Sequence, residues 1–173
     1  DEDLILNNAS LLKRAVRKRR IAVRSGHGVG KSFLVACLVL WWFYARKGRV
    51  VTTASTWSQV EQVLWSEIAQ LWQNAAVPLP GELLKTELRI DPTWYAVGLS
   101  TNETTAFQGR HHPRLLVVVD EAPGVPEDIH LAIATLATGT KNVIVMIGNP
   151  TALSGTFYNA FKNPAIWDCL HIS

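Results

Sequence analysis

Sulfur and charge are both scarce in this 173-residue chain, and each shortage excludes a class of protein. The two cysteines, Cys37 and Cys169, lie far apart and show no metal-ligand spacing, so the sequence indicates neither a disulfide framework nor a cysteine-based zinc site. That pattern fits a reducing compartment. Charged residues make up 18% of the chain and hydrophobic residues 48%, which is typical of a globular protein. The net charge of +3 permits a nucleic-acid partner without requiring one.

No apolar run is long enough to span a bilayer, which takes about 20 residues. The run from Phe33 to Ala45 is shorter, and it is followed by Arg46-Lys47-Gly48, a basic turn with a glycine stop. We therefore expect a helix buried against a sheet, and no membrane partner. The first residues, Asp1-Glu2-Asp3, show no secretory signal, and the length suits one domain with a single core.

A glycine-rich stretch stands where a phosphate-binding loop would stand. Residues 25–32 follow a short apolar strand predicted at 21–23 and precede the apolar helix predicted from Phe33. Backbone N–H groups and the helix dipole make such a turn an anion cradle. The stretch departs from the pattern G-x-x-x-x-G-K-[ST] at its first position, which is Ser25. An ordinary strand-to-helix turn with a solvated lysine is the alternative.

Each residue type in this loop suits the binding of a nucleoside triphosphate. Gly28 and Gly30 allow the turn to curl tightly, because a Cβ there would block either the positive φ or the phosphate. Lys31 would supply a full positive charge, and the hydroxyl of Ser32 would bind the Mg²⁺ that accompanies the nucleotide. The residues expected to bind the nucleotide here are Ser25, Gly26, His27, Gly28, Val29, Gly30, Lys31 and Ser32.

Two carboxylates follow a fully apolar run far downstream. Residues 115–119 are all apolar, which predicts a strand buried on both faces in the centre of a parallel sheet, and Asp120 and Glu121 come next. Ligands of open α/β sheets bind at this end of the strands. Burying acids is costly unless they meet a cation, and the phosphate loop makes Mg²⁺ the obvious one. Asp120 would hold Mg²⁺ and Glu121 would polarise the attacking water as general base. A charged turn after a buried strand is the alternative.

A second buried strand is predicted at 142–147, and it ends in Gly148-Asn149-Pro150-Thr151. This places the amide of Asn149 at the edge that holds Lys31 and Asp120, where it could sense the γ-phosphate. A plain Asn-Pro turn with no role at the phosphate is an equally good interpretation of this pattern. The adjacent histidines His111 and His112 have no partner at ligand spacing, so structural or surface roles are expected for them.

The other patterns give the frame around these motifs. Residues 11–20 have a helical apolar spacing with six basic side chains, for which a solvated face is favoured over a DNA-phosphate contact. Thr56 and Gln59 form a capping-box pattern before a second helix. The remaining predicted elements are strands at 49–54, 115–122 and 167–172, a hairpin of 87–90 with 94–99, a connector at 75–85 and a helix at 127–138.

Together these motifs resemble the ATPase domain of the large terminase subunit, the DNA-packaging motor of tailed bacteriophages. The resemblance is carried by Ala22–Ser32, Val51–Val60, Val118–Ala122 and Gly148–Thr151, and it covers most of residues 20–160. It implies that Lys31 and Ser32 bind phosphates and Mg²⁺. It further implies that Asp120 binds Mg²⁺, that Glu121 is the catalytic carboxylate and that 148–151 couple hydrolysis to movement. The family's nuclease domain has no counterpart here, so DNA cleavage is not assigned.

The resemblance also implies an arginine finger. In some members an arginine about ten residues before the catalytic glutamate reaches the nucleotide of the neighbouring subunit. Arg110 stands at that place and is the first candidate, with Arg114 second. Many members carry an arginine inside the phosphate loop, where this chain has His27. A finger acting on its own subunit's nucleotide is therefore doubtful here, although Arg24 lies nearby.

The expected fold is an α/β P-loop NTPase of the ASCE or RecA-like type, with a mostly parallel central sheet flanked by helices and an antiparallel hairpin insertion. The expected organisation is a single ATPase domain over 1–173, with a basic helical segment at 1–19 and the core at 20–173. The resemblance implies Mg²⁺-dependent hydrolysis of ATP that drives double-stranded DNA into a procapsid. It implies a homo-oligomeric ring on a capsid portal, a small terminase subunit as partner, and the cytoplasm of an infected or lysogenic bacterial host. Another DNA-dependent P-loop motor, such as a helicase core, or a nucleotide-regulated binding module with little turnover, stays as the alternative.

Overall fold

The computed structural model describes residues 11, 13–14, 19–26, 28, 30–102 and 104–172. They form an eight-stranded sheet with the order β3-β4-β5-β2-β6-β7-β1-β8. The pairings from β5 across to β8 are parallel, and those of β3 with β4 and of β4 with β5 are antiparallel. The strands are β1 (Arg20–Ser25), β2 (Arg49–Ala54), β3 (Glu82–Leu83), β4 (Glu87–Asp91), β5 (Trp94–Gly98), β6 (Leu115–Asp120), β7 (Val143–Gly148) and β8 (Asp168–Ile172).

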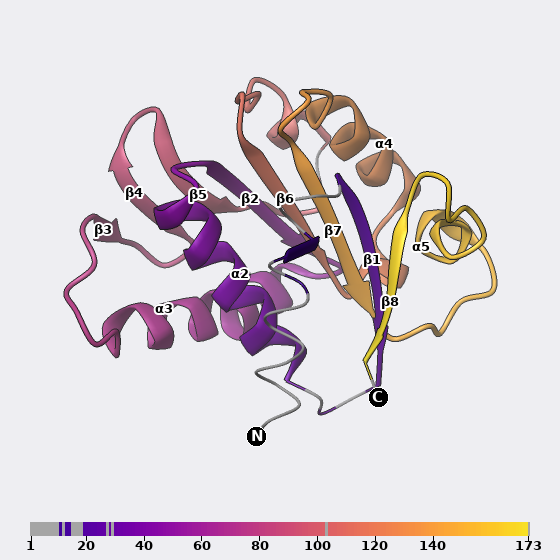
Figure 1. Ribbon diagram of the computed structural model, residues 1–173, viewed down its shortest axis with the longest axis horizontal. Coiled ribbons are helices and arrows are strands. Elements are labelled where there is room, and N and C mark those ends of the chain that lie inside the picture. Colours follow the sequence, from indigo (N-terminus) through magenta and orange to yellow (C-terminus); the bar gives the residue numbers. More distant parts are fainter. Residues whose placement is uncertain are drawn as a thin grey trace.

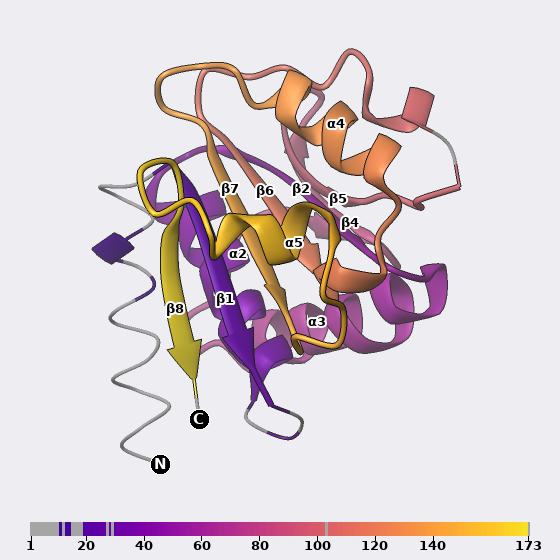
Figure 2. The same ribbon diagram turned by 90° about the vertical axis from the view of Figure 1, so that its right-hand side faces the viewer.

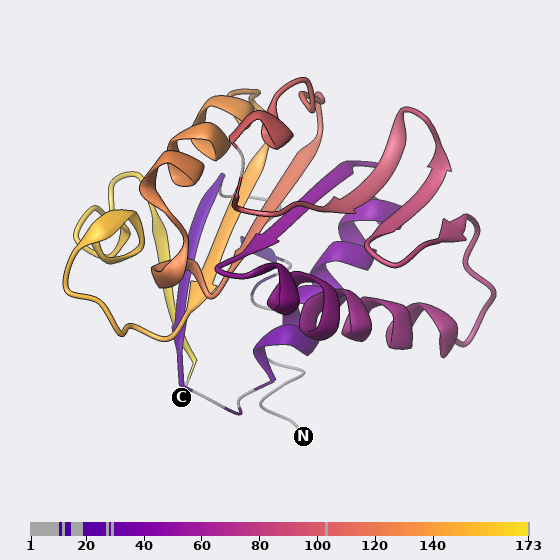
Figure 3. The same cartoon turned by 180° about the vertical axis from the view of Figure 1, so that it is seen from behind.

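Helices cover both faces of the sheet (Figure 1). Figure 2 shows α4 and α5 in front of the sheet and α2 and α3 behind it, and Figure 3 shows that the β3–β5 arm and α5 lie at opposite ends. No helix in the described part of the chain has the length and apolar character that crossing a bilayer requires. The helices are α2 (Lys31–Ala45), a π-helical segment η1 (Gln59–Trp65), α3 (Ser66–Gln73), α4 (Glu127–Leu136) and α5 (Gly155–Ala160), with 3-10 turns η2 (Thr104–Phe107) and η3 (Ala122–Gly124).

Strand β6 shows why both faces need cover. All of its residues are buried. Because side chains alternate across a strand, Leu116 and Val118 pack into the core beneath α2, whereas Leu115, Val117 and Val119 pack into the core beneath α4. A strand with two buried faces reads as an unbroken apolar run, so the predicted central parallel strand is confirmed.

Most predicted elements are confirmed, and the differences lie at their ends. The strand at 49–54 is β2, and the predicted hairpin is β4 with β5. The strand predicted at 115–122 ends at Asp120, because Glu121 has a φ of +44° and an extended strand cannot continue through that conformation. The helix predicted at 127–138 ends at Leu136. Of the predicted N-terminal segment, residues 1–10, 12 and 15–18 lie outside the described residues, and Leu11, Lys13 and Arg14 are helical.

Candidate active site

The motifs predicted to act together meet at one edge of the sheet. β1, β7 and β6 are neighbours and parallel, so their carboxyl ends share an edge. The arrowheads of β1 and β7 point downward to this edge in Figure 2. β7 lies between β1 and β6. The phosphate loop after β1 and the acids that end β6 are therefore separated by two inter-strand spacings, about 10 Å. This is the topological position at which open α/β sheets bind ligands.

The described part of the phosphate loop has the backbone that the glycines predicted. Gly28 and Gly30 have φ of 75° and 74°, in the left-handed region that favours glycine, and Gly30 directly precedes α2. A Cβ added to Gly28 would meet nothing within 4 Å, so its space is open on the protein side. Lys31 Nζ donates a 2.8 Å hydrogen bond to the carbonyl oxygen of Gly26, which holds the ammonium over the loop. His27 and Val29, both predicted to bind nucleotide, lie outside the described residues.

Ser25 carries a buried hydroxyl whose hydrogen-bonding capacity is unused. The residue is 2% exposed, and its Oγ has no hydrogen-bond partner among the described residues. A buried hydroxyl without a partner is costly, by about 1–3 kcal/mol, unless a ligand or water satisfies it. The end of β1 is therefore built to receive a polar group. Ser32, the predicted Mg²⁺ ligand, is half-buried in the first turn of α2.

Lys31 and Glu121 face each other across this edge. The distance from Lys31 Nζ to Glu121 Oε1 is 3.7 Å, although 90 positions of sequence separate the two residues. The lysine side chain is only 9% exposed and that of the glutamate is 29% exposed. The φ of +44° at Glu121 turns the chain away from the line of β6, and its N–H donates to Asp120 Oδ1 at 2.9 Å. Such a left-handed conformation at a glutamate is strained, and strain of this kind concentrates at functional sites.

Asp120 ends β6 as a buried carboxylate at 3% exposure. Desolvation by burial raises its pKa to about 6, an effect that the Glu121 N–H and the Lys31 charge only partly offset. The negative charge of Glu121 adds to the rise in pKa. A buried acid with a raised pKa fits a cation-binding role, because a bound Mg²⁺ would relieve the cost of ionisation.

This raised pKa predicts a pH-dependent stability difference between the wild type and Asp120→Asn without nucleotide or Mg²⁺. In the unfolded chain Asp120 ionises near its ordinary pKa of 3.8, whereas in the folded chain it ionises near 6. The wild type therefore loses stability, relative to the asparagine variant, as the pH rises from 4 to 7, by about 3 kcal/mol. Urea unfolding at several pH values measures the difference, with Asp128→Asn as an exposed control. Parallel pH profiles for the wild type and Asp120→Asn would contradict the prediction.

The segment after β7 packs against the turn that follows Glu121. A Cβ added to Gly148 would lie 2.5 Å from Pro123 Cδ and 3.2 Å from the nitrogen of Ala122, so only glycine fits there. Asn149 is half-buried and follows β7 directly, between the ends of β1 and β6. The structure thus brings the predicted sensor amide to the same edge as Lys31 and Asp120, and it places the Gly148 backbone against the turn beyond the acids.

Two residues of α4 connect this turn to α5, and no sequence pattern indicated either of them. His130 is buried, and its Nε2 lies 3.2 Å from the carbonyl oxygen of Ala122, so Nε2 carries the donated proton. Burial lowers the pKa of His130 and outweighs the opposing effects of Ala122 and Glu127, which keeps the ring neutral. Glu127 accepts hydrogen bonds from the N–H of Thr156, at 2.8 Å, and from its hydroxyl. Burial raises the pKa of Glu127, but these bonds and His130 together bring it below its usual value.

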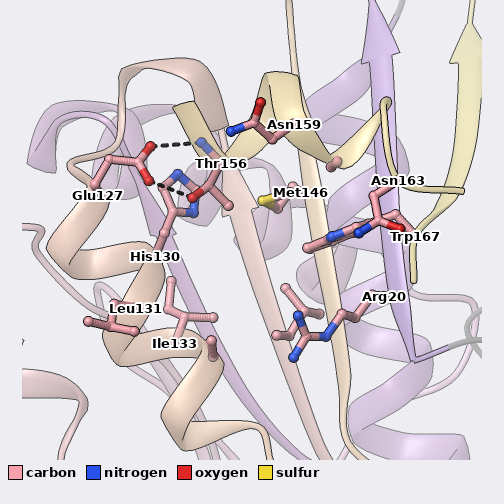
Figure 4. A pocket seen from close by; sticks show the side chains of 13 residues that line it. Arg20, Glu127, His130, Leu131, Ile133, Met146, Thr156, Asn159, Asn163 and Trp167 are labelled. Atoms are coloured by element: carbon pink, nitrogen blue, oxygen red, sulfur yellow. Dashed lines mark hydrogen bonds between the residues drawn. The ribbon is translucent and has the colours of Figure 1, made fainter. Parts of the chain in front are cut away.

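These contacts form the rim of a hollow of about 480 Å³ between α4 and α5 (Figure 4). Its floor is apolar and includes Ile144 and Met146 of β7, and Arg20 enters from the start of β1. Because Met146 and Ile144 point to the α4 face, the hollow lies on the opposite face of the sheet from α2. It is therefore separate from the phosphate loop.

The three candidate arginines lie in different places. Arg24 lies 5.5 Å from the ring of Phe161, at the end of α5, which directs it to the α4 face and away from α2. Arg110 donates to the carbonyl oxygen of Ala106 at 2.8 Å, and it lies 5.9 Å from the ring centre of Tyr95 at the start of β5. Arg114 precedes β6 and donates to Arg46 O. Arg110 and Arg114 are thus at the amino edge of the sheet, away from their own Lys31.

Within the described ranges no group of three or more His, Cys, Asp or Glu side chains could hold a metal ion. His111 Nδ1 lies 3.1 Å from the carbonyl oxygen of Leu136, and His112 Nδ1 accepts from the N–H of Arg114. Both histidines therefore have local structural contacts.

A central parallel sheet, a glycine loop that opens a helix, and an acid pair one strand away define a P-loop NTPase fold. Similarity to known proteins narrows this class. A probable terminase large subunit of Enterobacteria phage P7 is 29% identical in a 157-residue alignment that covers 84% of this chain and 32% of that protein. The chain thus spans about a third of the length of this curated relative. No family model matches the chain.

Solved large terminases share the fold. The large terminase of a thermophilic bacteriophage superposes with a TM-score of 0.78 at 12% identity, over 96% of this chain and 44% of that one. Structures of the same protein contain ADP and ATP-γ-S. The large terminase ATPase domain of Thermus phage P74-26 superposes with a TM-score of 0.69 at 18% identity, over 92% and 79% of the two chains. The resemblance to the large terminase subunit and the predicted fold class are both confirmed.

Proposed function

We propose that this chain is the motor domain of a large terminase subunit, which hydrolyses ATP to drive double-stranded DNA into a procapsid. The observation that carries the proposal is the meeting of Lys31, Asp120 and Glu121 at one sheet edge, with 3.7 Å between the lysine and the glutamate. A domain that only binds nucleotide has no need of a carboxylate beside the Mg²⁺ ligand. Similarity to a terminase large subunit and to terminase ATPase domains supplies the choice of substrate and partner.

The residues present fit a Mg²⁺–triphosphate. The open glycine backbone and the unpartnered hydroxyl of Ser25 suit phosphate oxygens, and the buried Asp120 suits a cation. Ser32 and Asp120 would hold Mg²⁺, which when bound neutralises phosphate charge. Lys31 would bind the phosphates, and Glu121 would take a proton from the attacking water. Asn149 would contact the γ-phosphate. His27 and Val29 complete the proposed loop set.

Hydrolysis would reach the rest of the domain through the turn after Glu121. Gly148 packs on this turn, His130 bonds to it, and Glu127 joins α4 to the start of α5. A displacement of Glu121 or Asn149 on loss of the γ-phosphate would therefore move α4 and α5 together. This supports a coupling role for 148–151, the segment that the resemblance assigns to it.

The proposal extends to the assembly. A homo-oligomeric ring on a capsid portal would bring Arg110 of one subunit to the nucleotide of the next, which fits its position away from its own Lys31. The small terminase subunit and double-stranded DNA would be the other partners, in the cytoplasm of the infected or lysogenic host. Residues 20–173 would form one ATPase core, with 1–19 as an N-terminal segment.

The first test is ATP binding by Lys31→Ala. Loss of a charge-assisted contact to phosphate is expected to weaken ATP binding by about ten- to hundredfold. Titration with a fluorescent ATP analogue measures it, with Lys85→Ala as a control, because Lys85 is exposed and pairs with Glu61 on the β3 side. If Lys31→Ala bound ATP with unchanged affinity, the assignment of residues 25–32 as a phosphate-binding loop would be rejected.

The second test combines chemistry, partner and assembly. ATPase activity is measured over a series of protein concentrations, with and without duplex DNA. A motor that works as a ring is expected to show a rate per subunit that rises with concentration and with DNA. If the rate per subunit responded neither to concentration nor to DNA, the proposed motor function would be rejected, and only a nucleotide-binding fold would remain supported.

A further inference from the structure

Basic side chains gather at the edge of the sheet opposite the nucleotide site. The amino ends of β1, β2, β6 and β7 each follow basic residues, and those of β1, β6 and β7 form the upper edge in Figure 2. We call these residues the basic row: they are Arg19, Arg20, Lys47, Arg49, Arg114 and Lys141.

The strand register places the residues of the basic row at similar positions along their strands. Arg49 pairs with Leu115, which follows Arg114, and Arg20 pairs with Ile144, three residues after Lys141. The four strands are adjacent in the order β2-β6-β7-β1, so the row extends over three inter-strand spacings, about 14 Å. Four of its six members are exposed, and Arg20 and Arg49 are half-buried.

In the described part of the chain the cations of the row form no ion pairs. The ion pairs of the described residues are made by Arg14, Lys31, Lys85 and Arg89, and Arg14 pairs with Asp168, which begins β8 beside the amino end of β1. The chain has 17 Lys and Arg against 14 Asp and Glu, so without the row 11 positive side chains remain against 14 negative ones. The six cations of the row thus exceed the net charge of +3 that the whole chain carries.

Local structure explains only part of the row. Lys47 follows α2, where the helix dipole favours a cation. Arg49 begins β2, and its guanidinium donates to the carbonyl oxygens of Thr93 and His111. Arg19, Arg114 and Lys141 precede strands, whose dipoles are small, so a dipole does not account for them. Arg49 lies 4.5 Å from the ring centre of Tyr95, the ring that also contacts Arg110. Both guanidinium groups donate to backbone carbonyl oxygens, which fixes their positions without neutralising their charge, and an external anion would stabilise the pair.

We infer that the basic row binds the phosphate backbone of duplex DNA. Each strand of a duplex carries one negative charge per about 3.4 Å of axis, so a row about 14 Å long lies alongside about four phosphates of the nearer strand. The triphosphate of a neighbouring subunit is a smaller anion and would meet only part of the row. This inference rests on the proposed function, and it adds the surface that touches the DNA.

The test is the salt dependence of DNA binding by Lys47→Gln/Lys141→Gln. Each lost phosphate contact lowers the slope of log K against log[salt] by about 0.9, so the slope is expected to fall by about 1.8 and the affinity at 0.1 M salt by about ten- to hundredfold. A fluorescent 30-base-pair duplex of mixed sequence is the probe, and anisotropy is the readout. Binding is measured without nucleotide, so a chain that proved unable to hydrolyse ATP would still give a result.

The matched control is Lys85→Gln/Arg89→Gln. It removes the same charge from two exposed residues on the β3–β4 side, each paired with a glutamate. Equal losses in both double variants would mean attraction by net charge alone and would overturn the inference. Unchanged DNA binding in Lys47→Gln/Lys141→Gln would also overturn it. Lost ATP-dependent self-association of that variant in sedimentation would then show that the row faces another subunit.

Discussion

Arg110→Ala is expected to lower the ATPase rate of assembled subunits by about a thousandfold or more, while ATP binding stays close to that of the wild type. An arginine finger stabilises charge that develops only in the transition state, and such residues are worth about 10³–10⁵ in rate. Arg110 lies against Tyr95 and Ala106 at the amino edge of the sheet, so it can serve a nucleotide only across a subunit boundary. Steady-state ATPase at a concentration that saturates assembly measures the loss.

Mixing two variants separates action across a boundary from a structural effect. Subunits with Arg110→Ala keep Glu121, and subunits with Glu121→Gln keep Arg110. If the finger acts across a boundary, the mixture regains part of the activity that each variant lacks. Arg110→Lys keeps the charge without the planar fork and is expected to stay slow. Absence of recovery in the mixture, or wild-type activity in Arg110→Ala, counts against this role. Arg114→Ala then tests the second candidate.

Glu121→Gln is expected to bind ATP and to turn it over about 10²–10⁴ times more slowly, which is the usual contribution of a general base. The amide has the size of the carboxylate but cannot accept the proton of the attacking water. Single-turnover hydrolysis, measured beside nucleotide affinity, separates chemistry from binding. The control is Glu82→Gln, an exposed residue of β3 far along the sheet from the site.

A Glu121→Gln variant that retained turnover would refute the role of this residue as base. A variant that lost binding instead would show that Glu121 mainly holds Lys31 in place through their ion pair. Thermal unfolding of the variant checks that the turn after β6 still forms.

The site could be predicted from the sequence because its parts are local patterns. The glycines before Lys31 and the apolar run before Asp120 each define a strand end, and parallel pairing brings strand ends together. The capping box is also local: Thr56 and Gln59 bond to each other as their spacing predicts, with Gln59 N donating to Thr56 Oγ1 at 3.2 Å.

The unpredicted parts depend on contacts between distant segments. α5 has six residues and begins at a glycine, so no apolar period marks it. β3, within the predicted connector at 75–85, has two residues that are extended only because β4 lies beside them. His130 interrupts an otherwise ordinary apolar helix face, and nothing in the sequence shows that it reaches Ala122. The π-helical segment η1 ends at Trp65, whose Nε1 donates to Thr52 Oγ1 of β2, a contact between separate segments that the sequence does not show.

The position of β7 between β1 and β6 has a mechanical consequence. Pulling β1 against β6 along the strand direction would have to shear both ladders of β7, in which four or five residue pairs share the load at once. The spacing between the phosphate loop and the acid pair is therefore stiff against force in that direction. In the proposed DNA-packaging motor, a load along the strands would therefore leave the distance between Lys31 and Glu121 unchanged when movement stops.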